Sequence, residues 1–177
     1  KKRFLELGYD EGTAGRYGMI ENIDDNFGRL LKKLKEWDVL DNTLIIFTTD
    51  NGATHLRGTL NGDKVKHFNA NLKGGKNSPN EGGNHVPLFF YWKDVIKEGK
   101  DINQLTAHID LYKTFSELAG AKLPEKMQYL KGLSLLPLLE NTATNWEDRL
   151  LFTHCGRWKT GKVEEAKYTK MAIRSQQ

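Results

Sequence analysis

The sequence predicts an α/β domain, because apolar runs of strand character alternate with stretches of helical spacing. Thr43–Thr49 and Val86–Trp92 are short, apolar and rich in β-branched or aromatic residues, the pattern of strands buried on both faces. Tyr17–Trp37 and His108–Leu118 carry apolar residues at helical intervals. Alternating strands and helices are typical of a largely parallel sheet covered by helices.

Composition limits the class of protein. The chain has 177 residues, enough for one domain with a sizeable core, and 38% of them are hydrophobic. Its 27 basic and 23 acidic residues are interspersed, so we expect no nucleic-acid surface. No apolar run approaches the roughly 18 residues of a membrane span. A single cysteine, Cys155, excludes an internal disulfide framework.

Taken in order, the N-terminal half begins with a polar stretch, residues 1–13, that we expect to be a loop. In the helix Tyr17–Trp37, acids come early and lysines late, which suits the helix dipole. Residues 51–85 separate the two strands and show no periodicity. A loop of that length inside a compact domain is more often functional than not.

In the C-terminal half, Gly120 ends the helix His108–Leu118. Leu133–Leu139 is an apolar docking segment, and Leu150–Thr153 and Tyr168–Arg174 have strand character. The chain lacks an initiator Met, and no apolar core follows its basic N-terminus. The N-terminus is therefore not read as a signal peptide, and the chain reads as an excised or processed piece whose start says nothing about where the parent protein resides.

Two oxygen-bearing side chains follow the first strand. In Thr49-Asp50-Asn51-Gly52, Asp50 offers a carboxylate and Asn51 an amide oxygen, hard donors that suit Ca²⁺ or Mg²⁺ better than zinc. An Asp at the C-terminal end of a parallel strand stands where open α/β sheets bind ligands. The same tetrapeptide is also a common turn, and the residues alone leave both interpretations open.

A glycine-flanked lysine lies in the long loop. The run Lys73-Gly74-Gly75-Lys76 permits close backbone approach to a ligand, and the ammonium of Lys76 is a compact charge for an oxyanion. A flexible, solvent-exposed tip is the alternative. A Walker P-loop is excluded, because its lysine motif is absent and no helix is expected next.

These segments resemble the sulfatase family. Thr43–Gly52 is similar to its metal-binding strand, and Lys73–Pro87, with Glu81-Gly82-Gly83 and Val86-Pro87, to its lysine-containing element. The resemblance continues through Ala107–Leu111 and Lys131–Leu139. It covers about Tyr17 to Arg174, and implies an alkaline-phosphatase-like sheet flanked by helices, present as a fragment without its N-terminal half.

The resemblance assigns roles to three residues. Asp50 and Asn51 match two Ca²⁺ ligands of the family, with Mg²⁺ as the second choice, and Lys76 matches a catalytic lysine that contacts the sulfate ester. Metal and ammonium together would offset the charge that develops as the S–O bond breaks. The implied substrate is a sulfated small molecule or glycan.

Several elements of the family are missing from these 177 residues: the nucleophile motif, the first paired aspartates of the metal site, and the central His and Lys. The family's nucleophile is a formylglycine made within a Cys/Ser-x-Pro/Ala-x-Arg motif, which this chain does not contain. Cys155 lies in a different context and reads as a packed or half-exposed thiol near a strand end. We therefore expect the formylglycine in the parent sulfatase, and no turnover by this chain alone.

Two histidines are weaker substrate-binding candidates. His55 and His85 lie in or beside the long loop and could line the pocket. His67 reads as loop surface, His108 as a structural residue at a helix start, and His154 as the end of a strand.

Several broader expectations complete the account. Residues 1–177 are expected to form the C-terminal part of a sulfatase catalytic domain, with core elements at about 17–140 and a C-terminal strand region at 150–177. Family resemblance implies a periplasmic or extracellular parent, and exposed fragment surfaces favour homo-oligomers. The rivals are a phosphatase or phosphodiesterase of the same superfamily and a non-catalytic anion- or glycan-binding module.

Overall fold

The computed structural model describes residues 1–54, 57–65, 68–127, 129–142 and 145–176. The chain forms two compact units. The first comprises Lys1–Lys93 and Cys155–Arg157, and the second comprises Asp94–His154 and Trp158–Gln177. Within the described residues, no helix is both long and apolar enough to cross a membrane.

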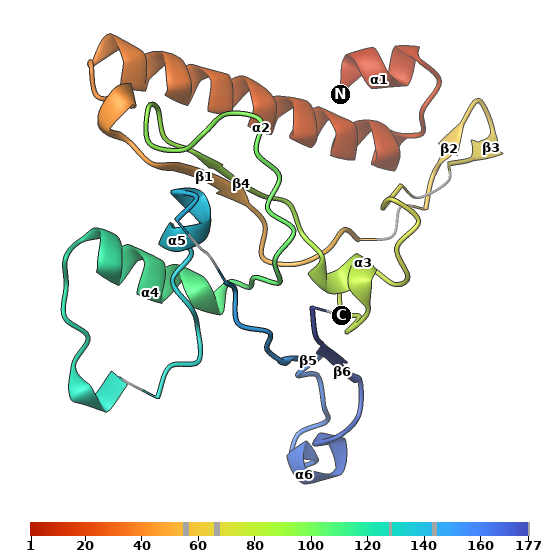
Figure 1. Ribbon diagram of the computed structural model, residues 1–177. Helices are drawn as coiled ribbons and strands as arrows, with labels where there is room; N and C mark the ends of the chain where they lie inside the picture. Colours follow the sequence, from red (N-terminus) through yellow and green to blue (C-terminus); the bar gives the residue numbers. More distant parts are fainter. Residues whose placement is uncertain (55–56, 66–67, 128, 143–144, 177) are drawn as a thin grey trace. The chain divides into compact units, whose positions relative to one another are not determined.

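The first unit is built on one long helix and a pair of strands (Figure 1). After α1 (Lys2–Glu6) come α2 (Glu11–Glu36) and the 3₁₀ turn η1 (Leu40–Asn42). The strands are β1 (Ile45–Thr48), β2 (Thr59–Leu60), β3 (Asp63–Lys64) and β4 (Leu88–Tyr91), with the one-turn helix α3 (Glu81–Asn84) before β4. The helix Tyr17–Trp37 and both apolar strands of the sequence prediction are confirmed, with shifted ends.

The start of the chain differs from expectation, because residues 1–13 are largely helical. Asp10 caps α2 by accepting hydrogen bonds from the backbone N–H groups of Gly12 and Thr13, at 3.0 and 3.1 Å, so the helix starts at Glu11. α1 forms beside it, with the Phe4 ring 5.5 Å from that of Tyr17. Tertiary packing thus makes a helix of a segment that is polar in sequence.

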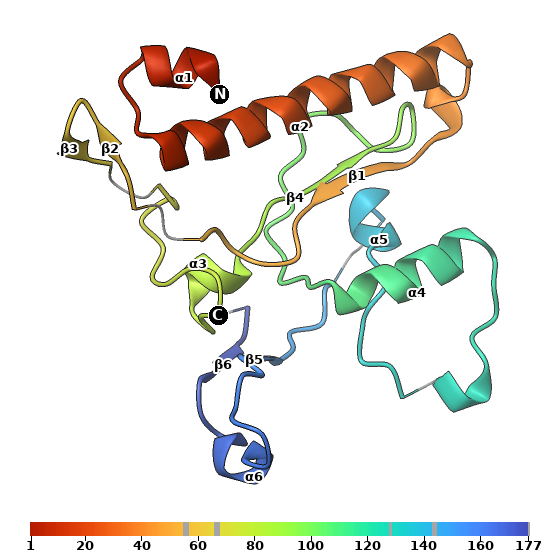
Figure 2. The same cartoon turned by 180° about the vertical axis from the view of Figure 1, so that it is seen from behind.

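The sheet also differs from the expected one. β1 pairs with β4 in antiparallel register, from Ile45 opposite Tyr91 to Thr48 opposite Leu88. The expectation of a parallel pair buried on both faces is wrong for these strands, since Phe89 is 65% exposed. An apolar run alone does not reveal strand direction, which only the pairing decides. Figure 2 shows α2 running along this pair, where Phe27 contacts Phe47 with ring centroids 5.8 Å apart.

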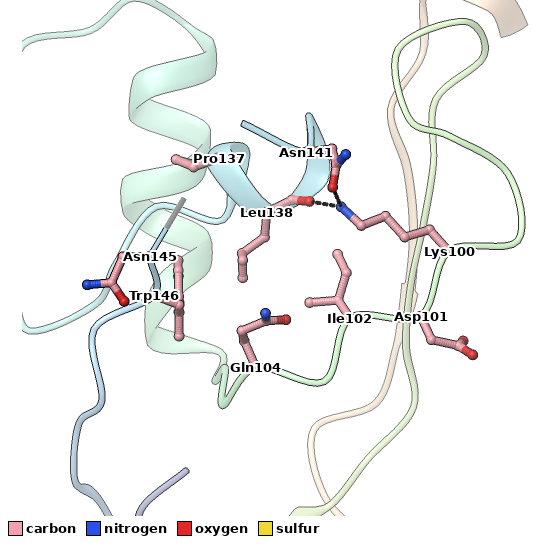
Figure 3. Close-up of a pocket in the computed structure, with 9 residues that line it drawn as sticks. All are labelled: Lys100, Asp101, Ile102, Gln104, Pro137, Leu138, Asn141, Asn145 and Trp146. Atoms are coloured by element: carbon pink, nitrogen blue, oxygen red, sulfur yellow. Dashed lines mark hydrogen bonds between the residues drawn. The ribbon is translucent and has the colours of Figure 1, made fainter. Parts of the chain in front are cut away.

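The second unit contains α4 (Ile109–Leu118), η2 (Glu125–Met127), α5 (Leu136–Leu139), β5 (Leu151–His154), α6 (Val163–Ala166) and β6 (Met171–Arg174). The sequence prediction of the helix, the apolar segment and the two last strands is confirmed, and β5 and β6 pair antiparallel. Lys100 ties the chain before α4 to α5: its ammonium donates to Leu138 O at 2.5 Å and Asn141 Oδ1 at 3.1 Å (Figure 3).

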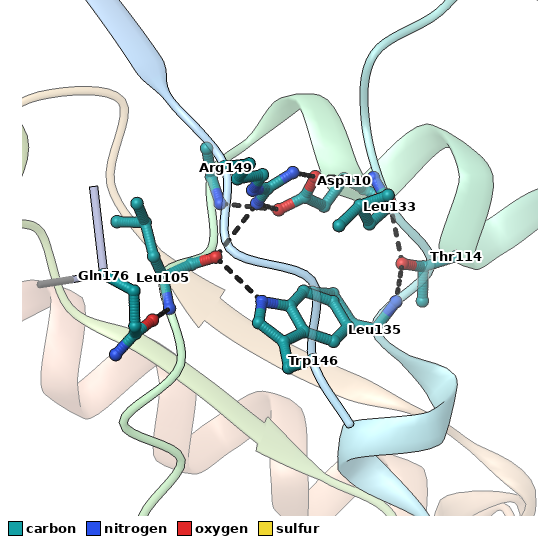
Figure 4. Close-up of polar contacts among 9 residues, drawn as sticks. Leu105, Asp110, Thr114, Leu133, Leu135, Trp146, Arg149 and Gln176 are labelled. Carbon is teal, nitrogen blue, oxygen red and sulfur yellow. Dashed lines mark hydrogen bonds and ion pairs between the residues drawn. The ribbon is translucent and has the colours of Figure 1, made fainter. Parts of the chain in front are cut away.

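A buried ion pair joins α4 to the segments around it (Figure 4). The carboxylate of Asp110, fully buried, accepts from both terminal nitrogens of Arg149 and from the backbone N–H groups of Ala107 and Leu133. Thr114, also buried, accepts from Leu135 N at 2.9 Å. These contacts hold the apolar segment against α4, and all the buried leucines among the described residues lie there: Leu135, Leu136, Leu138 and Leu139.

Candidate active site

Asp50 and Asn51 lie side by side just beyond the C-terminal end of β1. Asp50 is exposed and Asn51 is half-buried. The side-chain amide of Asn51 donates from Nδ2 to Asp50 Oδ1 at 3.0 Å, and the Thr49 hydroxyl donates to Asn51 O at 3.3 Å. With its nitrogen turned toward Asp50, the amide leaves Oδ1 to accept from or coordinate another group. The two side chains can therefore present oxygens to one ligand.

Lys76 stands at the corner of a tight turn that touches the same backbone. Ser78 N donates to Gly75 O at 2.9 Å, and Asn77 takes a left-handed φ of 68°. The backbone N–H of Lys76 donates to Ala53 O at 2.9 Å, and its side chain is exposed. The main chain of Lys76 is thus anchored to Ala53, which lies three residues after Asp50. The interpretation of this loop as a free tip is not what the structure describes.

Glycines allow the two segments to meet. Gly52 N donates to Gly83 O at 2.9 Å, and a Cβ on Gly52 would lie 1.8 Å from Gly82 O. A Cβ on Gly82 would lie 2.1 Å from Gly74 O. Because atoms cannot approach so closely, each of these positions requires glycine or a displaced backbone. The glycine-rich element therefore fixes the backbone positions of Asp50, Asn51 and Lys76. The sequence had indicated only that these glycines permit close approach to a ligand.

Asn69 is a supporting residue that sequence reasoning missed. Its Nδ2 donates to Leu72 O at 2.7 Å and to Gly74 O at 3.0 Å, which holds the start of the lysine loop. Ser78 acts similarly, since its hydroxyl accepts from Asn80 N at 3.2 Å. An asparagine in a loop rich in Gly, Asn and Lys gives no distinctive sequence signal, so only the folded backbone identifies this one.

The histidines divide between the units. His85 is exposed at the end of α3, a one-turn helix that the sequence did not predict, and its Nδ1 lies 3.3 Å from Glu81 Oε2. Its role in a substrate pocket stays a prediction. His55 and His67 lie outside the described residues.

In the second unit, the exposed His108 is the N-cap residue of α4, and the structural role expected of it stays a prediction. His154 ends β5 and stacks on Trp158, with ring centroids 6.0 Å apart. Cys155, the next residue in the sequence but part of the first unit, is a half-buried free thiol, as the sequence suggested.

The donor set fits a hard cation incompletely. Asp50 and Asn51 supply a carboxylate and an amide oxygen, which suit Ca²⁺ or Mg²⁺. Among the described residues, no three His, Cys, Asp or Glu side chains gather as a metal site would require. Ca²⁺ takes about six to eight oxygens, so water, substrate or other protein groups would complete the shell. Metal binding by this pair stays a prediction.

Comparisons with known families place the chain among the sulfatases. The sulfatase family model matches residues 7–121, and a model described as "N-sulphoglucosamine sulphohydrolase, C-terminal" matches residues 77–176. Human arylsulfatase H is 36% identical over 158 residues, covering 88% of this chain and 27% of that protein. Human steryl-sulfatase is 36% identical over 81% of this chain and 25% of its own length. The chain thus spans about a quarter of these relatives.

Solved structures give the same fold. One, titled "Crystal structure of Ps i-CgsB in complex with k-i-k-neocarrahexaose", has a TM-score of 0.67 and 33% identity, covering 81% of this chain and 30% of that one. A phosphonate monoester hydrolase from Silicibacter pomeroyi, 24% identical with a TM-score of 0.57 over 86% of this chain and 28% of its own, shares the fold. The expected alkaline-phosphatase-like α/β class is confirmed. Since the sulfatase model covers well over half of its residues, the chain belongs to the sulfatase family.

Proposed function

We propose that this chain supplies the metal- and sulfate-binding part of a sulfuric ester hydrolase. The observation that carries the proposal is the shared backbone frame, in which Gly52 N bonds to Gly83 O and Lys76 N to Ala53 O. This frame brings the residues after β1 and the turn of Lys76 into one structure. These main-chain contacts hold the backbone that carries two hard oxygen donors and a cation, and they do not depend on a ligand.

Each residue has a distinct task in this proposal. Asp50 and Asn51 would hold Ca²⁺, or Mg²⁺ as second choice, and the bound cation would act as a Lewis acid toward a sulfate oxygen. Lys76 donates from its ammonium to another sulfate oxygen, because charge-assisted hydrogen bonds to oxyanions are strong. Its fixed main chain lowers the ordering cost of that contact. Exposure of Asp50 and Lys76 leaves both heads accessible to a substrate.

The 177 residues bind but do not turn over in this proposal. They contain no Cys/Ser-x-Pro/Ala-x-Arg motif from which a formylglycine could be made. Without a nucleophile the ester bond is polarised but not attacked. The chain should therefore release no product from a chromogenic aryl sulfate, and release at a rate typical of enzymes would contradict this part.

The proposed substrate is a sulfated glycan. Two similarities support this class: the structure whose title names a bound neocarrahexaose, and human N-acetylgalactosamine-6-sulfatase, 36% identical over 72% of this chain and 24% of that protein. Human steryl-sulfatase is equally similar, and its name refers to an ester that is not a carbohydrate. We choose the glycan because Lys76 and Asp50 are exposed, which leaves room for a large substrate.

Binding of 4-nitrophenyl sulfate, followed by amide chemical shifts in the presence of Ca²⁺, tests the proposal. Lys76→Met should weaken binding about ten- to a hundredfold, the cost of one hydrogen bond to a charged group. Lys73→Met is the matched control, because Lys73 is an exposed lysine of the same glycine-rich run. It should change affinity by about twofold or less, as expected for a solvated charge.

Three other outcomes would contradict the proposal. Equal losses in the two lysine variants would show general charge attraction and would refute a built sulfate site. Tight Ca²⁺ and anion binding by this chain alone would favour the rival, a non-catalytic binding module. A phosphate ester bound more tightly than the sulfate ester would favour the phosphatase rival.

A further inference from the structure

A small cleft lies within the second unit, between the chain that leads to α4 and the α5 region (Figure 3). Its volume is about 180 Å³. Ile102, Gln104, Leu138 and Trp146 surround a common space, and Lys100 lies at one end. None of these residues takes part in the site of Asp50 and Lys76, which belongs to the first unit.

Two of the side chains that border the cleft, Trp146 and Lys100, are held in place by contacts within the protein. The indole N–H of Trp146 donates to Leu105 O at 3.3 Å, and the Arg149 guanidinium lies 6.0 Å from its ring centroid. Lys100 is fixed by its bonds to Leu138 O and Asn141 Oδ1. Two of its three N–H groups are used there, which leaves one for a ligand. Preorganised groups of this kind lose little freedom on binding.

The lining has two chemical characters. Ile102, Leu138 and the Trp146 ring offer apolar surface, while Gln104 adds an amide that both donates and accepts hydrogen bonds. Among the lining residues that the structure describes, Asp101 is the one carboxylate and Lys100 the one cation. The volume of the cleft is below the ~300–1,000 Å³ of sites for drug-sized ligands, so it suits one small ring.

We propose that this cleft binds one sugar ring of a glycan chain. A pyranose has the matching duality, since its C–H faces pack on apolar and aromatic surface while its hydroxyls both donate and accept. Gln104 would pair with one hydroxyl and the remaining N–H of Lys100 with another. That the glycan is the substrate of the same protein rests on the function proposed above. The ring in this cleft would be a unit other than the one whose sulfate meets Lys76.

Desulfated oligosaccharides separate this proposal from the preceding one, because they offer nothing to a sulfate site. We would present neutral galactan and N-acetylhexosamine-containing hexasaccharides to the full 177-residue chain and detect contact by saturation-transfer NMR. At least one should bind. Gln104→Leu, which keeps the volume and removes the amide, should weaken binding about tenfold, the loss of one hydrogen bond. Ile102→Trp, which fills the cleft, should abolish it.

Two controls complete the experiment. Asn103→Leu changes a neighbouring exposed amide outside the lining and should bind like the unaltered chain. Lys76→Met should leave desulfated binding unchanged while it weakens aryl sulfate binding. Failure of every hexasaccharide to bind, or unchanged binding by a correctly folded Ile102→Trp variant, would overturn the saccharide cleft and leave the sulfate site standing. Loss of the desulfated glycan in Lys76→Met would also overturn it.

Discussion

Removing the charge of Asp110 should destabilise the second unit severely. Its carboxylate is fully buried, and Arg149, whose side chain is 11% exposed, donates to it at 2.7 and 2.5 Å. In Asp110→Asn, one oxygen becomes an NH₂ group that faces other donors, and the guanidinium loses its counter-charge. Breaking a buried pair in this way costs about 3–5 kcal/mol. Domains of this size are stable by about 5–15 kcal/mol, so the change removes a large share.

Urea unfolding followed by near-ultraviolet circular dichroism measures the loss. Glu165→Gln is the control: Glu165 pairs with Lys162 in the same unit, but the two side chains are 67% and 54% exposed. Its free energy of unfolding should change by about 0.5 kcal/mol or less. A double-mutant cycle of Asp110→Ala with Arg149→Ala should show a coupling energy of about 1.5 kcal/mol or more. A loss below about 0.5 kcal/mol in Asp110→Asn would refute the reasoning.

Three further predictions concern the first unit. Hydrogen bonds from the backbone N–H of Thr59 and then of Thr13 lower the pKa of Asp10 from 3.8 to about 2. The stability that the Asp10 carboxylate contributes is therefore present above pH 3.8 and is lost as pH falls through about 2. Acid unfolding of Asp10→Asn should no longer show this loss, and an NMR titration of the Asp10 carboxyl with a pKa near 3.8 would contradict the prediction. Gly52→Ala should displace Gly82 and weaken Ca²⁺-dependent aryl sulfate binding about tenfold or more, whereas Gly28→Ala, which meets no atom within 4 Å, should not alter it. The exposed apolar stripe of α2, which includes Ile23 at 57% exposure, should cause concentration-dependent self-association in light scattering, and a chain that stays monomeric, or an Ile23→Glu variant that still associates, would count against it.

Local chemistry made much of the fold predictable. Apolar runs and helical spacing located β1, β4 and α4, because the spacing of apolar residues along a short segment depends on whether it is a strand or a helix. The start of α2 could also have been found, since an aspartate at position 10 before a helical stretch is an N-cap signal. The direction of β4 relative to β1 could not be predicted, because an apolar run has the same pattern in a parallel and in an antiparallel pair.

The candidate site shows the same limit. Sequence named Asp50, Asn51 and Lys76 from their residue types and their surroundings. It could not show that Gly52 packs on Gly82, thirty residues further along the chain, because such contacts exist only after folding. The pairing of Asp110 with Arg149 was missed for the same reason, as the two are 39 residues apart.

Reciprocal binding of Ca²⁺ and a sulfate ester tests most directly whether Asp50, Asn51 and Lys76 form one site. Calorimetry on the 177-residue chain would measure the Kd of Ca²⁺ with and without 4-nitrophenyl sulfate, and the Kd of the ester with and without Ca²⁺. Because linkage is reciprocal, each ligand should tighten the other by the same factor, about fivefold or more. Asp50→Ala should abolish this coupling, and Asp63→Ala, which removes an exposed aspartate of β3, should preserve it. Independent binding of the two ligands, or coupling that survives in Asp50→Ala, would contradict the account.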